Sequence, residues 1–118
     1  MQYALLIYER PDAYAALSAE QRQALTGEYL TLQQDPRILG GARLKPAETA
    51  TTLRLSEGES LIIDGPFADT KEVFGGYYLL EAEDVDAALE IAGRIPAARF
   101  GGAVEIRPIL QVMGGRFT

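Results

Sequence analysis

Apolar residues fill both sides of two extended segments of the chain, which is unusual because most strands alternate apolar and polar positions. Residues 2–8 and residues 77–81 each place apolar side chains on both faces of an extended backbone. Residues 103–109 alternate instead, with an apolar face and a charged face. The pattern predicts two strands that are buried on both faces and one strand that lies at an edge of the sheet.

Helical spacing appears twice between these strands. Ser18 and Gln21 have the spacing of a capping box, and the helix they start is ended by Pro36. Asp84 is placed to cap a second helix over residues 85–92, whose apolar positions form one stripe. Both predicted helices therefore present an apolar side to a common core.

The middle of the chain predicts shorter extended pieces. Residues 42–45 follow a pair of glycines and precede a proline. Residues 51–56 and 60–63 flank residues 57–59, a Glu-Gly-Glu turn, and are predicted to form a β-hairpin.

The order of elements is strand, helix, strand with a hairpin excursion, strand, helix, strand. This order predicts an α+β, ferredoxin-like split βαβ fold with an inserted β-hairpin, in a single domain over residues 1–118. In that topology the first and third core strands are central, which suits the two segments that are apolar on both faces. The helices cover one face only, so we expect a homodimer in which the other sheet face is covered by a second copy.

Charge and composition exclude several classes of protein. The formal net charge of -6 opposes attraction to phosphate backbones, and the arginines are scattered singly, so no direct nucleic-acid binding is expected. Apolar residues make up 47%, but no run approaches the roughly 20 residues needed to span a bilayer. Because the N-terminus also lacks the layout of a secretory signal, we expect no membrane association and a cytoplasmic location.

The chain contains no cysteine and no histidine. Their absence excludes Ser-His and Cys-His mechanisms and zinc-thiolate sites. No EF-hand spacing is present either, so neither a metal nor a cofactor is expected. Carboxylates, tyrosines, arginines and the two lysines remain to carry any chemistry.

The segment IIDGPFADTKE, residues 62–72, holds the two candidate catalytic residues. Asp64 ends an apolar strand, where a partly desolvated carboxylate would suit proton transfer. Alternatively, Asp64 accepts backbone N–H groups or the Thr70 hydroxyl and locks the turn. Lys71 lies between carboxylates and is either a catalytic amine or a solvated ion-pairing residue.

Other residues of this segment have structural explanations. Asp69 and Glu72 have the spacing of a capping pair, which predicts a single helical turn over residues 70–73. Phe67 is expected to plug the small core or to join the dimer contact.

Candidate ligand-binding residues lie on the strands and on the first helix. Glu105 and Arg107 share the face of the last strand opposite the helices, where Arg107 could anchor a carboxylate. An ion pair at the sheet edge explains them as well. Tyr8, Tyr29 and Tyr77 could offer phenolic hydrogen bonds to a cavity, or serve as aromatic core residues.

Four motifs in the same order also carry a family resemblance: YALLIYE at 3–9, DGPFADTKE at 64–72, GGYYLLEAED at 75–84 and VEIRPI at 104–109. With these motifs the chain resembles the YCII-related, or DGPF, domain family over nearly its whole length. The resemblance implies a dimeric α+β barrel, in which two sheets face one another across a cavity.

The resemblance transfers function less well than fold. Some relatives are thought to use a histidine on the first helix and an aspartate after the second helix, and one branch performs dechlorination. Those positions fall near Tyr29 and Ile95, and neither residue matches, so this chemistry does not carry over. Some DGPF members occur beside or fused to sigma factors.

These observations favour an uncharacterised small-molecule-binding protein, or an enzyme, with its site in the cavity between the sheets of a homodimer. The expected ligand is small and anionic or aromatic. One alternative is a protein-interaction module, such as an accessory of a sigma factor. Another is a structural domain whose motif only builds the dimer.

Overall fold

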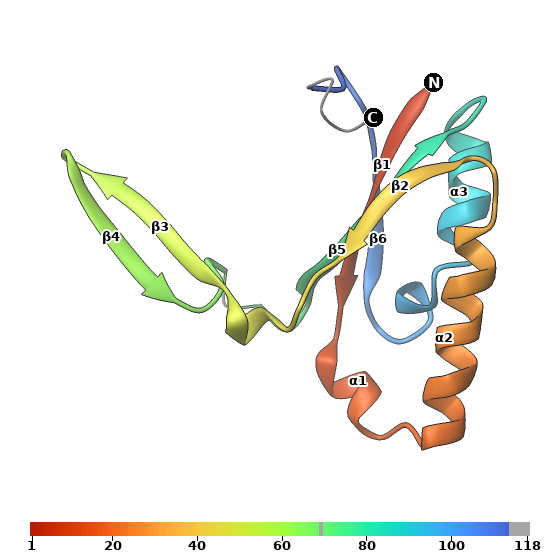
Figure 1. Cartoon of the computed structure of the whole chain (residues 1–118), viewed down its shortest axis with the longest axis horizontal. Helices are drawn as coiled ribbons and strands as arrows, with labels where there is room; N and C mark the ends of the chain where they lie inside the picture. Colours follow the sequence, from red (N-terminus) through yellow and green to blue (C-terminus); the bar gives the residue numbers. More distant parts are fainter. Residues whose placement is uncertain (69, 114–118) are drawn as a thin grey trace.

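The computed structural model describes residues 1–68 and 70–113, and it has two parts: a four-stranded antiparallel sheet with helices on one face, and a separate two-stranded hairpin. Figure 1 shows the helices on one side of the sheet and the hairpin projecting on the other side. The sheet order is β2-β5-β1-β6, so the predicted α+β, ferredoxin-like fold with an inserted hairpin is confirmed.

The elements follow the chain in the predicted order. The strands of the sheet are β1 (Gln2–Glu9), β2 (Ile38–Arg43), β5 (Val73–Glu81) and β6 (Ala103–Pro108). The hairpin consists of β3 (Thr51–Ser56) and β4 (Glu59–Asp64). The helices are α1 (Pro11–Ala15), α2 (Ala19–Gln33) and α3 (Val85–Ala92), with 3-10 turns η1 (Ala47–Thr49) and η2 (Pro96–Ala98).

The two strands that are apolar on both faces, β1 and β5, occupy the centre of the sheet as predicted. On the helix side of β1, Leu5 is fully buried, and Leu80 is fully buried on β5. Both side chains belong to one core cluster that also includes residues of α2, α3 and the segment after α3. Burial of this cluster, rather than helix propensity, holds the helices to the sheet.

Local signals fix where the two longer helices begin. Ser18 Oγ accepts a hydrogen bond from the Gln21 N–H at 3.1 Å, and the Gln21 side chain accepts one from the Ser18 N–H at 2.8 Å. Asp84 accepts a hydrogen bond from the Ala87 N–H at 2.9 Å and caps α3. Both predicted caps are confirmed.

An ion-pair cluster joins the end of α2 to β2 and α3. The Asp35 carboxylate accepts hydrogen bonds from Arg37 at 2.8 Å and from Arg94 at 3.2 Å. The hydrogen bonds from Arg37 hold the pKa of Asp35 well below its usual range. The cluster fixes the connection that brings β2 back beside β5.

Two strand boundaries differ from the prediction for one reason. β2 runs over Ile38–Arg43 and includes Gly40 and Gly41, and β5 begins at Val73 and includes a second glycine pair. A Cβ at Gly41 would collide with the Tyr77 carbonyl, so the close packing of β2 on β5 requires glycine there. The glycines therefore belong to the strands and do not separate them.

The helical turn predicted over residues 70–73 is wrong. Residues 71 and 72 form a bend and β5 begins at Val73. The Thr70 hydroxyl donates to the Glu72 carbonyl oxygen, which closes the bend without a helical turn. Asp69, the other member of the proposed capping pair, lies outside the described residues.

The hairpin of residues 51–64, called the arm below, is tightly turned and stands apart from the sheet (Figure 1). Glu57 and Gly58 connect its strands, with φ angles of 51° and 81°. Two consecutive residues with positive φ are typical of a type I′ turn, which matches the twist of paired strands.

The DGPF motif fastens the base of the arm. The Gly65 N–H donates to the Ala50 carbonyl oxygen at 2.7 Å, and the Thr52 hydroxyl donates to the Gly65 carbonyl oxygen at 2.8 Å. Gly65 has a φ of 116°, a conformation open chiefly to glycine. Phe67 is 69% exposed, so the prediction that it plugs the core is wrong, and its place in a dimer contact stays a prediction.

The helices described between residues 1 and 113 include none that is long and apolar enough to cross a membrane.

Candidate functional site

A β-bulge at the end of β1 redirects Glu9. Ile7 pairs with Gly76 and Tyr8 pairs with Phe74, so Gly75 is left without a partner on β1. The Glu9 carboxylate occupies the space beside this glycine, and a Cβ on Gly75 would lie 2.6 Å from Glu9 Oε2. The bulge and the glycine together place a carboxylate at the edge of the core.

Glu9 lines a pocket of about 260 Å³ between the ends of β1 and β2 and the helices α1 and α2. Two leucines form its apolar wall and its other lining side chains are polar or charged, which suits a small ligand that carries polar groups. Its lining includes Glu9, Tyr14, Leu17, Leu25, Tyr29 and Arg43. We call it the Glu9 pocket.

The Tyr14 hydroxyl is buried and forms no hydrogen bond of normal length and angle with a described residue, although the Tyr29 hydroxyl lies close enough to lower its pKa. Its ring packs against the Phe100 ring with the centroids 5.7 Å apart. Arg22 fixes the backbone of the same helix by donating to the Tyr14 carbonyl oxygen at 3.0 Å. A rigidly held but unsatisfied hydroxyl is costly in a folded protein, and such groups point to a partner that the chain alone does not supply.

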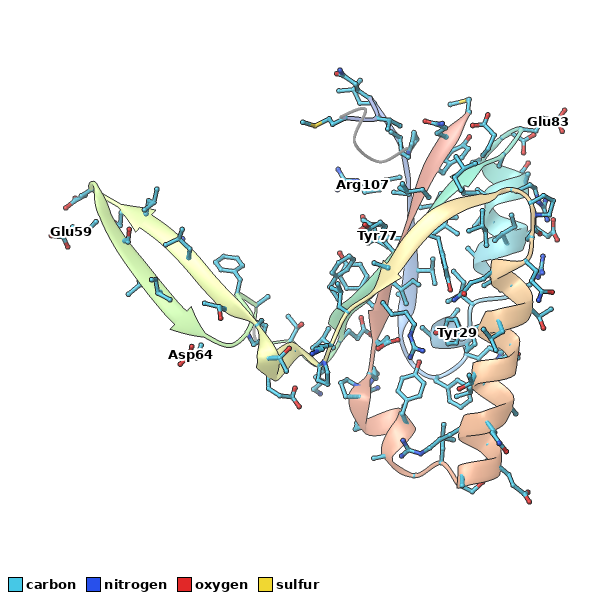
Figure 2. The ribbon with its side chains drawn as sticks, in the orientation of Figure 1. Tyr29, Glu59, Asp64, Tyr77, Glu83 and Arg107 are labelled. Atoms are coloured by element: carbon cyan, nitrogen blue, oxygen red, sulfur yellow. The ribbon has the colours of Figure 1, made fainter. Side chains whose placement is uncertain are left out.

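Tyr29 and Arg43 complete the polar side of the Glu9 pocket. Tyr29 is 8% exposed and projects from α2 toward the sheet, where Figure 2 shows it on the helix side. The Arg43 guanidinium carbon lies 5.3 Å from the centre of the Tyr29 ring, in a cation–π contact. Arg43 itself is exposed, so its charge is available at the mouth of the pocket.

Burial sets the protonation of the Glu9 pocket. Desolvation raises the pKa of the Glu9 carboxyl, and the nearby Arg43 charge opposes this rise. Desolvation also raises the pKa of the Tyr14 hydroxyl, with a further contribution from the Glu9 charge. Desolvation is also the main cause that raises the pKa of the Tyr29 hydroxyl. Both phenols therefore stay protonated and can donate hydrogen bonds.

This arrangement combines two phenol donors, a carboxyl group with a raised pKa and a guanidinium. The phenols and Arg43 can bind the oxygens of a ligand, while Glu9 can accept or donate a proton beside them. Among residues 1–68 and 70–113, no three acidic side chains gather closely enough to hold a metal ion.

Glu9→Gln is expected to raise the stability of the protein at pH 7 to 8, by no more than about 1 kcal/mol because the carboxyl is only partly buried. The pKa of Glu9 is raised in the folded state, so the charged form opposes folding above that pKa. This penalty disappears as the pH falls below the unfolded value near 4.3, where both states are protonated. Thermal unfolding of both proteins between pH 4 and 8 measures the difference.

The matched control is Glu83→Gln, which removes the same charge from an exposed glutamate between β5 and α3, away from the Glu9 pocket, and should not raise the stability. A Glu9→Gln protein that is less stable than the wild type at pH 8 would contradict the desolvation argument.

Asp64 and Lys71, the candidate catalytic residues, lie away from the Glu9 pocket. Asp64 ends β4 and is exposed on the arm, where Figure 2 shows it. Its carboxylate accepts no hydrogen bond from the described residues, and the Thr70 hydroxyl donates elsewhere, so Asp64 does not lock the turn through Thr70. Lys71 is exposed beside a shallow hollow that Tyr8 also lines. Their catalytic roles stay predictions.

The other predicted residues, apart from Tyr29, lie on the sheet face opposite the helices. In the pairing register Leu6 stands between Tyr77 and Glu105, and Ala4 stands beside Arg107. Figure 2 shows Tyr77 and Arg107 on the side away from α2. Neither Glu105 nor Arg107 forms an ion pair with another described residue, so the structure contains no edge ion pair at this place.

Sequence reasoning found Tyr29 but missed Glu9, Tyr14 and Arg43. One signal was available for Glu9, because it is the first charged residue after a strand that is apolar on both faces. The glycine pair at 75–76 also marks a place where two backbones, or a backbone and a side chain, approach closely. Tyr14 and Arg43 carry no local signal, since only the fold brings them to Glu9.

Comparisons with known proteins agree with this fold. The model of the YCII-related domain matches residues 1–113. An uncharacterized protein of Rhizobium meliloti is 37% identical over 114 residues, which cover 92% of each chain.

A solved structure with a similar fold is 5-chloro-2-hydroxyhydroquinone dehydrochlorinase from Burkholderia phenoliruptrix, in complex with 2,5-dihydroxybenzoquinone. It is 18% identical, with a TM-score of 0.50, and the match covers 99% of this chain and 98% of the other. At this identity the likeness shows the fold alone.

Proposed function

The chain belongs to the YCII-related domain family, and from this membership and the Glu9 pocket we propose that it binds a small molecule and uses Glu9 for proton transfer. The observation that carries the proposal is the buried Tyr14 hydroxyl without a hydrogen-bond partner among the described residues. A ligand oxygen in the pocket would accept this hydrogen bond.

The residues that line the Glu9 pocket indicate which class of ligand it would bind. A pocket of about 260 Å³ suits a ligand no larger than a single substituted ring. Arg43 favours an anionic oxygen at the mouth, and the Tyr14 hydroxyl favours a second oxygen inside. We therefore propose a small phenol or carboxylic acid, a class close in size to 2,5-dihydroxybenzoquinone, the single-ring ligand of the dehydrochlorinase that shares the fold.

One further point supports this pocket, and another concerns the alternative function. Tyr29 stands near the helix position at which, by the family resemblance, a histidine is thought to act in other branches, so the same corner of the fold is used with different chemistry. The names of the two similar proteins give no support to a sigma-factor accessory.

The proposal includes a homodimer that covers the open sheet face, by which we mean the face carrying Ala4, Leu6, Tyr77 and Leu79. In that homodimer a second place for a ligand is the cavity between the sheets. A hollow of about 520 Å³ at the base of the arm, lined in part by Tyr8, Phe67 and Phe74, favours this place.

Ligand binding can be tested by thermal shift, with 2,5-dihydroxybenzoquinone and small phenols and carboxylic acids as probes at up to millimolar concentration. We expect at least one probe to stabilise the wild type, and Tyr14→Phe and Arg43→Leu each to weaken its binding at least tenfold. Tyr14→Phe should leave the unliganded stability unchanged or higher, because it removes an unpaired buried hydroxyl.

Arg107→Leu is the control, because it removes an exposed arginine from the open sheet face. If Arg107→Leu abolishes the shift while Tyr14→Phe retains it, the ligand lies between the sheets and the Glu9 pocket is not the site. If no probe produces a shift, the small-molecule proposal fails.

A further inference from the structure

The arm exposes large apolar side chains on a face of its own. In the arm, Leu53 lies opposite Ile62, and Leu55 lies opposite Ser60. Because side chains alternate between faces along a strand, Leu53, Leu55 and Ile62 share one face, which we call the apolar arm face. These side chains are 61%, 72% and 66% exposed, respectively.

The other described residues do not cover the apolar arm face. At the base of the arm, Gly65 is hydrogen-bonded to Ala50 and Thr52. Figure 1 shows the arm leading away from the sheet. Arg54 lies on its other face, with its guanidinium carbon 5.0 Å from the centre of the Phe67 ring. A two-stranded hairpin is marginally stable in water unless its apolar face packs on something.

The chain carries a matching surface that is also uncovered, the open sheet face. It lies on the side of the sheet toward which the arm projects (Figure 1). Leu6 and Leu79 on this face are only partly buried, although they belong to the two central strands. One arm cannot lie on its own sheet, since it leaves that sheet at its base and diverges from it.

We propose that the apolar arm face of each copy docks on the open sheet face of a second copy. This inference rests on the homodimer of the proposed function. It states that the contact made by the arm holds the two copies together. In a two-fold symmetric pair both arms make the same contact, so the assembly closes at two copies.

The arms supply part of a specific interface. A free leucine or isoleucine side chain presents on the order of 100 Å² of apolar surface, so the three partly exposed side chains of one arm present roughly 200 Å². Each copy also has its open sheet face covered by the partner's arm over a similar area, which brings the buried surface to roughly 400 Å² per copy. This is about half of the roughly 800 Å² per partner of a standard interface, and contacts between the facing sheets supply the rest in the proposed homodimer.

Charge also selects the docking face. Apart from Asp64, which pairs with Thr51 at the base of the arm, the apolar arm face carries no charged residue, so the burial of its outer part has no ionic penalty. The opposite face of the arm also exposes Leu61 and Ile63, but it carries Arg54 and Glu59 on its outer part. The net charge of -6 makes two copies repel at long range, so the contact must be apolar to hold them.

The first experiment compares the wild type with a variant that combines Leu53→Ser, Leu55→Ser and Ile62→Ser, using light scattering from about 1 to 100 μM. The wild type should have twice the chain mass of 12.8 kDa, and the variant should associate at least about 100-fold more weakly. Far-UV circular dichroism of the variant's sheet and helices should be unchanged. The control combines Leu30→Ser and Leu89→Ser, which remove side chains of similar exposure from the helices and should not weaken the dimer.

The second experiment uses the absence of cysteine in the chain, so that any disulfide comes from the introduced thiols. A mixture of Leu55→Cys and Leu6→Cys proteins should form a cross-link between copies on oxidation. A mixture of Leu55→Cys and Leu30→Cys proteins should not, because Leu30 lies on α2.

The outcomes separate the two proposals. A wild type that stays at 12.8 kDa overturns both the homodimer and the docked arm. A dimer that the triple serine variant leaves intact, or one that cross-links arm to arm through Leu55→Cys alone, overturns the docked arm and leaves the homodimer of the proposed function standing. Ligand binding at the Glu9 pocket is measured separately and depends on neither result.

Discussion

Leu5→Ala is expected to lower the free energy of unfolding by about 3 kcal/mol, because it removes a fully buried side chain from the central strand β1 and leaves a cavity. Leu5 faces α2 and α3 within the core cluster, where little rearrangement can fill the space. Urea unfolding followed by circular dichroism measures the loss directly.

Leu6→Ala is the matched comparison, since Leu6 is the next residue of β1 and faces the open sheet face. We expect it to cost at most about 1 kcal/mol at low protein concentration, because Leu6 is partly exposed in a single copy. In the proposed homodimer its effect grows with protein concentration, whereas the effect of Leu5→Ala stays constant. A loss below 1 kcal/mol for Leu5→Ala would contradict the described core.

Gly76→Ala is expected to destabilise the protein by about 2 to 3 kcal/mol. A Cβ on Gly76 would lie 2.6 Å from the Ala42 carbonyl oxygen, so the backbones of β5 and β2 would have to separate. Because Arg43 is the register partner of Gly76, the substitution also moves one wall of the Glu9 pocket. Thermal unfolding and probe binding should both report the change.

Gly75→Ala should behave differently, although the two glycines are neighbours. Its Cβ would lie 2.6 Å from Glu9 Oε2, the end of a flexible side chain that can move aside. We expect a loss of stability below that of Gly76→Ala and a loss of any proton-transfer activity, since Glu9 is displaced. Equal destabilisation by the two substitutions would show that Glu9 is held as rigidly as the backbone.

The fold could be predicted from the sequence because its signals are local and agree with one another. The two strands that are apolar on both faces identified the sheet centre, and Ser18 and Asp84 identified the helix starts. The predicted boundaries of β2 and β5 were wrong, because glycine is a poor strand residue by propensity. The glycines are needed in these strands because two backbones approach closely there.

The candidate site was less predictable, for a physical reason. Glu9, Tyr14 and Arg43 come from three elements that meet only after the sheet and helices have packed. The sequence pointed instead to Asp64 and Lys71, which lie in the motif whose Gly65 forms the hydrogen bonds at the base of the arm. A motif of this kind can be required for the backbone conformation of a turn as well as for catalysis.

The Leu44 N–H donates a hydrogen bond to the Gly75 carbonyl oxygen at 2.9 Å. This hydrogen bond joins the two places at which the chain leaves the sheet after β2 and returns to it in β5. Residues 45–72 thus form an insertion whose ends already meet, and its length can change in evolution without disturbing the sheet. If the arm selects the second copy, related proteins in one cell that differ in this insertion would each pair with their own kind, and mixed pairs would be avoided.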